Sequence, residues 1–226
     1  MPSPDQALID SLRTRLNTSV VGDVLDTLGL THQFLPPHIR AVNPDHVMVG
    51  RAMTVLEADA ASDYVTQAQK TDSFGLMFKA LDSLTTGEVY ICTGSSPRYA
   101  LWGELMSTRA MSLGATGAVL DGFHRDTRGI KALDFPVFSS GSYAQDQRLR
   151  GRVIDYRCPI EFDNGVRVDN GDVVFGDIDG VVIIPAARLA EAVELALAKV
   201  AGEEQVRTLI EAGGTTEQIF ADTGIM

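Results

Sequence analysis

Three polar residues that follow a short apolar run are the part of this chain best suited to chemistry. The run, Thr116–Leu120, is typical of a buried strand, and the turn signal Asp121-Gly122 ends it. His124, Arg125 and Asp126 come directly afterwards. A guanidinium beside a carboxylate suits an anionic ligand, a metal ion or both, although the same residues would also fit an ion pair on a surface loop.

The segments before this run predict how the polar residues are positioned. Glu88–Thr93 reads as a second buried strand, and Gly103–Leu113 has apolar residues at helical spacing with Gly114 available as a C-terminal cap. A strand, a helix and a strand within about 30 residues form a βαβ unit. We therefore expect the two strands to be parallel.

Parallel strands place their ligands at the edge where the strands end. The helix begins at this edge and the loop after the second strand leaves from it, so the free N–H groups of Glu104, Leu105 and Met106 should face Arg125 and Asp126. A helix N-terminus attracts anions, and the planar fork of Arg125 suits a carboxylate or an enolate. The Glu104 and Asp126 carboxylates are ligands of the type that Mg²⁺ or Mn²⁺ prefers.

Three motifs resemble those of the 4-hydroxy-4-methyl-2-oxoglutarate aldolase family, which also contains the regulator of ribonuclease activity A. They are G-E-L-M-S-T-x-A at 103–110, G-A-x-G-A-V-x-D-G-x-x-R-D at 114–126 and G-D-V-V-F-G-D-x-D-G-V-V-I-I-P at 171–185. The motifs occur in the family's order and spacing, and the resemblance runs from about Ser19 to the C-terminal helix.

The resemblance implies a metal-dependent lyase that cleaves a 4-hydroxy-2-oxo acid to pyruvate, with oxaloacetate decarboxylation as a related activity. Asp126 would hold Mg²⁺ or Mn²⁺, and Arg125 would stabilise the enolate charge. The backbone from Gly103 to Met106 would hold the substrate carboxylate. Glu104 would order the water that takes the hydroxyl proton, and His124 is expected to contact the substrate.

The resemblance also implies an oligomer. The family's aldolases are trimers or hexamers in which a C-terminal acidic residue reaches the neighbouring subunit's site. Glu203 and Glu204 are the candidates here, on a helix predicted over 186–212 that is apolar on more than one side at its start. Residues 186–226 are thus expected to form an arm between subunits, although the same helix would also fit as a cover for its own sheet.

The rest of the chain predicts a single α/β domain over residues 1–226, of the swivelling β/β/α type. Further helices are expected at Ala7–Asn17, from Thr18 or Ser19 to Gly29, and at Phe74–Leu84. Further strands are expected at Met48–Glu57, in the segment that leads from Lys131 to Phe138, and at Val166–Val168, Val173–Phe175 and Val181–Ile184. Hairpin turns are expected at Asn164-Gly165 and Asn170-Gly171. Asp177–Gly180 should be a turn between two strands rather than a calcium site.

Composition excludes several classes of protein. The net charge of −11 argues against a nucleic-acid partner. No apolar run is long enough to span a membrane, and the N-terminus lacks the pattern of a signal peptide. Two cysteines, Cys92 and Cys158, are expected to be free thiols in a reducing, cytoplasmic setting.

Other functions remain open. A non-catalytic regulator that binds another protein, as in the ribonuclease-regulator branch, would suit an acidic oligomer. A phosphohistidine carrier shares the topology, but only His124 lies near a glycine-containing loop. Schiff-base chemistry requires a desolvated lysine, and none of the four lysines falls at the predicted edge. The chain also has no glycine-rich strand end of the kind that a methyltransferase would need.

Overall fold

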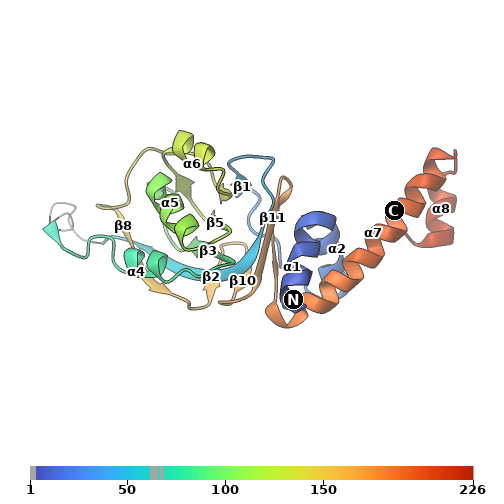
Figure 1. Cartoon of the computed structure of the whole chain (residues 1–226), viewed down its shortest axis with the longest axis horizontal. Coiled ribbons are helices and arrows are strands. Elements are labelled where there is room, and N and C mark those ends of the chain that lie inside the picture. Colours follow the sequence, from blue (N-terminus) through green and yellow to red (C-terminus); the bar gives the residue numbers. More distant parts are fainter. Residues whose placement is uncertain (1–3, 62–65, 67–68, 226) are drawn as a thin grey trace.

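A curved, mixed β-sheet forms the centre of the protein (Figure 1). The structure, a computed structural model, describes residues 4–61, 66 and 69–225. Residues 1–3, 62–65, 67–68 and 226, which the prediction of a single domain included, lie outside the described residues. None of the helices in the described part of the chain is both long and apolar enough to cross a membrane.

The main sheet has the strand order β1-β7-β5-β3-β2-β11-β12, and β8 also pairs with β2. Its strands are β1 (Arg40–Ala41), β2 (Met48–Asp59), β3 (Glu88–Thr93), β5 (Gly117–Leu120), β7 (Val137–Ser139), β8 (Gly151–Tyr156), β11 (Val173–Asp177) and β12 (Gly180–Ile184). Two small ribbons, β4 (Ala100–Trp102) with β6 (Phe123–His124) and β9 (Ile160–Glu161) with β10 (Arg167–Val168), accompany it.

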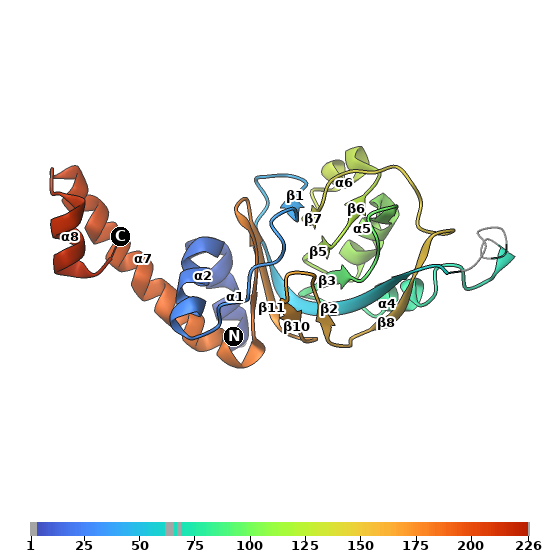
Figure 2. The same cartoon turned by 180° about the vertical axis from the view of Figure 1, so that it is seen from behind.

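The helices lie in two groups (Figures 1 and 2). One group is α4 (Met77–Asp82), α5 (Glu104–Ser112) and α6 (Thr127–Leu133), which cover the parallel strands. The other is α1 (Pro4–Arg15), α2 (Thr18–Thr27), α7 (Leu189–Glu211) and α8 (Thr216–Thr223). The predicted α/β class, with a βαβ unit and a long C-terminal helix, is confirmed.

The parallel centre of the sheet is buried on both of its faces. Strands β2, β3, β5 and β7 pair in parallel, as the βαβ pattern predicts. On β3, Tyr90 and Cys92 belong to the core that contacts α4, α5 and α6, whereas Val89 and Ile91 belong to the core on the opposite face, where β9 and β10 pack. All four side chains are buried, so β3 carries a continuous apolar run rather than a polar alternation.

The C-terminal helix projects away from the sheet (Figure 2). Its first half buries Leu189, Ala192, Val193 and Ala196 in the core formed with α1 and α2. Its second half carries α8 folded back along it, and Val206 and Ile219 are the buried residues there. The helix therefore covers its own domain with its first half only.

Two sequence predictions about turns and caps are wrong. The side chain of Asn17, not of Thr18 or Ser19, caps α2 by accepting from the Val20 N–H at 2.9 Å. Thr18 Oγ1 donates instead to Asp177, because its backbone N–H and hydroxyl both face that carboxylate. The Asn170-Gly171 turn does not close a hairpin, since β11 pairs with β2 and β12 and not with β10.

Other predicted turns and strands are confirmed. The Asn164-Gly165 turn joins the antiparallel β9 and β10, and Asp177–Gly180 joins β11 to β12. The elements that the sequence did not reveal are β1, β4, β6, β8, β9, α6 and α8. Of these, β4, β6 and α6 carry or flank the polar residues singled out by the sequence.

Candidate functional site

The short ribbon of β4 and β6 brings the predicted site residues together. Trp102 pairs with His124 in parallel, and the Arg125 N–H donates to the Trp102 carbonyl at 2.9 Å. The residue after Trp102 is Gly103, the N-cap of α5, and the residues after His124 are Arg125 and Asp126. The two chain segments are thus held side by side, and the N-terminus of α5 lies next to the Arg125-Asp126 pair.

Asp126 has an unusual backbone, and its carboxylate does not cap its own helix. It occupies the left-handed region at φ 57°, which non-glycine residues rarely adopt. As the N-cap of α6 it makes no side-chain capping bond. Its Oδ2 instead accepts a weak hydrogen bond from the backbone N–H of Glu104 at 3.4 Å. Asp134 and Arg157 share this conformation, which aspartate adopts more readily than most residues, so the position of the Asp126 carboxylate matters here rather than its φ value.

Gly103 leaves the room that this carboxylate needs. A Cβ atom on residue 103 would lie 2.6 Å from Asp126 Oδ2, well inside the normal contact distance. The φ of Gly103 is −156°, an extended value that any residue adopts, so the requirement for glycine comes from space alone. The helix N-terminus and the carboxylate therefore approach each other because residue 103 has no side chain.

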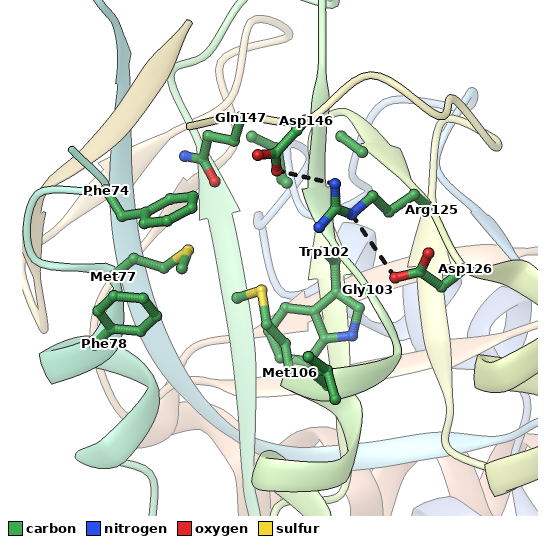
Figure 3. Close-up of a pocket in the computed structure, with 13 residues that line it drawn as sticks. Phe74, Met77, Phe78, Trp102, Gly103, Met106, Arg125, Asp126, Asp146 and Gln147 are labelled. Atoms are coloured by element: carbon green, nitrogen blue, oxygen red, sulfur yellow. Dashed lines mark ion pairs between the residues drawn. The ribbon is translucent and has the colours of Figure 1, made fainter. Parts of the chain in front are cut away.

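Arg125 lies between two carboxylates (Figure 3). Its Nε is 3.7 Å from Asp126 Oδ2, and its Nη1 is 3.0 Å from Asp146 Oδ1. The side chains of Arg125, Asp126 and Asp146 are each roughly 40–50% exposed, so solvent screens these pairs and their main effect is orientation. The guanidinium lines a cavity together with both of these carboxylates.

That cavity has a volume of about 200 Å³ and is bounded by β4, α4, α5 and the segment around Asp146. Its polar lining is Gly103, Arg125, Asp126, Asp146 and Gln147, and its apolar lining is Phe74, Met77, Phe78, Ala100, Leu101, Trp102, Leu105 and Met106. The expected residues Gly103, Leu105 and Met106 thus line it together with Arg125 and Asp126. A concave, mostly apolar site with a few convergent polar groups is the usual form of a small-molecule site.

A buried acid supports the polar end of the cavity from behind. Gln147 Nε2 donates to Glu57 Oε2 at 2.6 Å. Burial raises the pKa of Glu57 to about 8, and the bond from Gln147 only partly offsets this rise. Glu57 Oε1 and the hydroxyl of Tyr90 are also buried, and neither forms a hydrogen bond among the described residues. Buried groups with displaced pKa values are typical of functional sites.

The sequence missed Asp146, Gln147 and Glu57. Asp146 and Gln147 follow β7, which runs parallel to β5. Parallel strands end at the same edge of a sheet, so the loop after a third parallel strand leaves from the same edge as the first two. This was the available signal for Asp146 and Gln147. Glu57 lies in β2, and its place directly after the apolar residues Val55 and Leu56 was the available signal for it.

The structure places three predicted residues away from the cavity. The Glu104 side chain lies over Gly129 of α6, so close that a Cβ atom there would overlap its carboxylate. Glu203 and Glu204 are both on α7, which extends away from the cavity (Figure 1). Glu203 Oε1 lies 3.6 Å from Lys199 Nζ of the same helix. Within one subunit, Glu203 and Glu204 therefore do not reach the site.

His124 is buried and both of its ring nitrogens have partners, so the packing gives no support to the expected contact with the substrate. Its Nδ1 is 2.7 Å from Ser139 Oγ and its Nε2 is 3.0 Å from Thr127 Oγ1, so both ring nitrogens have partners. The residue is 4% exposed and does not line the cavity. Burial lowers its pKa. A neutral imidazole between Ser139 and Thr127 fixes the start of α6 relative to β7.

The donor set of the cavity fits a small hard cation. Among the described residues, no group of three or more His, Cys, Asp or Glu side chains is arranged to hold a metal ion. Mg²⁺ and Mn²⁺ do not need such a cage, since Mg²⁺ commonly uses one or two carboxylates and completes its shell with water and substrate oxygens. Asp126 is half exposed and does not cap α6, so its carboxylate is suited to that role.

Comparison with known proteins agrees with this architecture. The family model described as "RraA-like: Aldolase/RraA" matches residues 18–183. The chain belongs to this RraA-like family. A Halalkalibacterium halodurans protein, provisionally named 4-hydroxy-4-methyl-2-oxoglutarate aldolase, is 32% identical over 87% of this chain and 85% of its own length.

Two further relatives of this RraA-like chain differ in length or identity. Protein DlpA of Legionella pneumophila is 28% identical over 98% of this chain, but the chain spans only 36% of DlpA. The crystal structure of Streptomyces coelicolor RraAS2, titled an unusual member of the RNase ES inhibitor RraA protein family, superposes with a TM-score of 0.79 at 23% identity, covering 91% of this chain and 98% of that one. At this identity the likeness shows the fold alone.

Proposed function

We propose that this RraA-like protein is a metal-dependent lyase that cleaves a 4-hydroxy-2-oxo acid to pyruvate and an aldehyde or ketone. The observation that carries the proposal is the convergence of Arg125, Asp126 and the N-terminus of α5 on one cavity. The provisional aldolase name of the Halalkalibacterium halodurans relative supports the same class of reaction. Oxaloacetate decarboxylation passes through the same pyruvate enolate and is proposed as a second activity.

The cation and the anion sites have separate tasks. Asp126 would hold Mg²⁺ or Mn²⁺, which when bound supplies a Lewis acid for the 2-oxo group. Arg125 donates to the oxygen on which negative charge develops when the C3–C4 bond breaks. The N–H groups of Leu105 and Met106 lie in the first turn of α5, where they have no intrahelical acceptor, and they bind the substrate carboxylate.

The proton on the substrate hydroxyl needs an acceptor. Among the described residues, the carboxylates that line the cavity are Asp126 and Asp146, whereas Glu104 lies outside it. Since Asp126 is assigned to the metal, Asp146 or an acidic residue from a neighbouring subunit takes the proton, directly or through water. The second possibility follows the family resemblance and involves Glu203 or Glu204 in a trimer or hexamer.

The experiment is an assay of pyruvate release from a panel of 4-hydroxy-2-oxo acids and oxaloacetate with Mg²⁺ or Mn²⁺. EDTA should abolish release, and Asp126→Ala should stay inactive at high metal concentration. Asp134→Ala is a matched control, because Asp134 is also left-handed, at φ 55°, but lies at the other end of α6. Full activity in EDTA, or in Asp126→Ala, would remove the metal role.

A non-catalytic regulator that binds another protein is the second candidate. The family description covers both aldolases and RraA, and the net charge of −11 suits a basic partner surface. The panel assay separates the two functions, since a regulator releases no pyruvate from any member of the panel.

A further inference from the structure

A second cavity opens at the carboxyl ends of the parallel strands, and we call it the strand-end cavity. Its volume is about 560 Å³, and it shares no lining residue with the cavity around Arg125 and Asp126. β3, β5 and β7 each contribute a polar residue to it where the strand ends, namely Thr93, Asp121 and Ser140. Its other lining residues are His38, Gly94, Ser95, Pro97, Gly122, Glu161 and Asp163. Ligands of parallel sheets bind at this edge, so the cavity lies where a ligand site is expected.

The carboxylate of Asp121 is held in place inside the strand-end cavity. Thr93 Oγ1 donates to Asp121 Oδ2 at 2.6 Å, and His38 Nε2 lies 3.3 Å from Asp121 Oδ1. The backbone N–H of Asp121 donates to the Cys92 carbonyl at 3.0 Å, which fixes the residue at the end of the strands. The Asp121 side chain is 17% exposed, so part of this ordered carboxylate is within reach of a ligand.

A buried hydroxyl group indicates a ligand independently of the carboxylates. Ser95 Oγ has almost no solvent exposure and forms no hydrogen bond among the described residues. Gly122, which also lines the strand-end cavity, lies close to it, since a Cβ atom at Gly122 would be 3.8 Å from this oxygen. A buried hydroxyl without a partner is unfavourable, and a polar ligand in the cavity would satisfy it.

The charge of the lining determines the class of ligand. Asp121 lies inside the strand-end cavity and Glu161 and Asp163 lie exposed at its rim, whereas His38 is the one basic residue among the described residues that line it. An anion would therefore be repelled. A bare metal ion is not favoured either, since no group of three or more His, Cys, Asp or Glu side chains in the described part of the chain is arranged to hold one. An ammonium group has three N–H donors, which match carboxylate and hydroxyl oxygens spread around a cavity.

We propose that the strand-end cavity binds a small organic cation with primary ammonium groups, such as a short aliphatic diamine. One ammonium group donates to Asp121 and to the Ser95 hydroxyl, and the other faces Glu161 and Asp163 at the rim. The volume suits a molecule of this size better than a single ion. Because the strand-end cavity is separate from the candidate active site, this binding does not depend on the aldolase activity proposed above.

Isothermal titration calorimetry of the full chain with putrescine tests the proposal. The matched neutral ligand is 1,4-butanediol, which has the same four-carbon chain and carries hydroxyl groups in place of the ammonium groups. Salt at about 0.15 M screens long-range attraction between exposed charges. Putrescine should bind once per subunit and at least about tenfold more tightly than 1,4-butanediol, because the diol cannot form charge-assisted hydrogen bonds. Absence of putrescine binding, or equal binding of the two ligands, overturns the proposal.

Two charge-matched variants separate this site from general attraction to an acidic protein. Asp121→Asn should weaken putrescine binding about tenfold or more, the loss expected for one hydrogen bond to a charged group. Asp134→Asn is the control, because Asp134 also pairs with a histidine, His46, at 2.8 Å but lies at the end of α6 and does not line the strand-end cavity. Both variants change the net charge of −11 by one unit, so equal weakening by both shows non-specific binding and overturns the proposal.

Three further variants locate the bound cation. Ser95→Ala should weaken putrescine binding about threefold, as for one neutral hydrogen bond. Glu161→Gln, at the exposed rim, should weaken it at least as much and replaces Asp121→Asn if that variant does not fold. Asp126→Ala should bind putrescine as the wild type does, because Asp126 lines the other cavity. Circular dichroism and thermal unfolding verify folding. Loss of binding in Asp126→Ala, or unchanged binding in both Ser95→Ala and Glu161→Gln, assigns the cation to another site and overturns the proposal.

Discussion

Arg125 and Asp146 are joined by an ion pair, with Arg125 Nη1 3.0 Å from Asp146 Oδ1. The pair connects the segment after β6 to the segment after β7 and sets the direction in which the guanidinium faces the cavity (Figure 3). Both side chains are about 40% exposed, so the pair adds little to folding stability. Its consequence is the orientation of a ligand-binding group.

Asp146→Asn should therefore lower kcat/KM about tenfold while leaving the free energy of unfolding within about 0.5 kcal/mol of wild type. The measurement is steady-state pyruvate release together with urea unfolding. Asp82→Asn is the control, because Asp82 pairs with Arg109 at 2.8 Å on exposed helices and does not line the cavity. If Asp146 instead accepts the hydroxyl proton, kcat should fall far more and lose its acidic pH limb.

The sequence predicted one half of this ion pair and missed the other, for a physical reason. Arg125 directly follows a buried apolar run, so its position at a strand edge could be inferred from local pattern. Asp146 lies in an irregular segment that has no periodicity, and its position depends on how β7 joins the sheet. Local pattern also predicted β3 and α5 closely, whereas β4 and β6 are too short to leave a periodic signal.

Substitution of Arg125 tests whether its shape or only its charge matters. Arg125→Ala should lower kcat by about 10²–10³-fold, the cost that is typical of losing one oxyanion donor. Arg125→Lys should also be poor, because an ammonium cannot face Asp146 and a ligand with one planar fork. Wild-type turnover in Arg125→Lys would show that the residue contributes only positive potential.

Two glycines allow the side chains of Asp126 and Glu104 to be perturbed separately. Gly103→Ala would push the Asp126 carboxylate, whereas Gly129→Ala would push that of Glu104. Neither glycine has a left-handed φ, so both variants should fold. We expect Gly103→Ala to weaken metal binding and so raise the Mg²⁺ concentration for half-maximal activity at least tenfold. Gly129→Ala should leave it unchanged, and the reverse result would assign the metal to Glu104.

Glu57 should make stability depend on pH. Burial raises its pKa from 4.5 to about 8, so the folded protein keeps a proton that the unfolded chain releases above pH 4.5. The stability contribution is full below pH 4.5 and is lost as pH rises towards about 8, at up to ~1.4 kcal/mol per pH unit. Glu57→Gln removes this loss, so its stability relative to wild type should increase between pH 5 and pH 8.

Glu88→Gln is the control for that titration. Although burial alone would raise the pKa of Glu88, the hydrogen bonds from Arg157 lower it below 4.5. Its contribution is therefore present above pH 4.5 and is lost only as pH falls through the lowered pKa. Urea unfolding from pH 5 to pH 8 should show a pH-dependent difference for Glu57→Gln and a constant one for Glu88→Gln. A flat difference for both variants would contradict the buried-acid interpretation.

The final prediction is that α7 completes the site of a neighbouring subunit. The first half of α7 packs on α1 and α2, and the second half projects beyond the domain with Glu203 and Glu204 (Figure 2). Light scattering should give a trimer or a hexamer, and truncation after Gly202 should reduce activity far more than thermal stability.

Inactive Asp126→Ala subunits mixed with Glu203→Ala/Glu204→Ala subunits should regain activity, because some sites then combine an intact Asp126 with an intact acidic pair. Asp126→Ala subunits mixed only with each other are the control and should stay inactive. A monomer, or a truncated protein with normal turnover, would leave α7 as a cover for its own domain and assign the proton acceptor to Asp146.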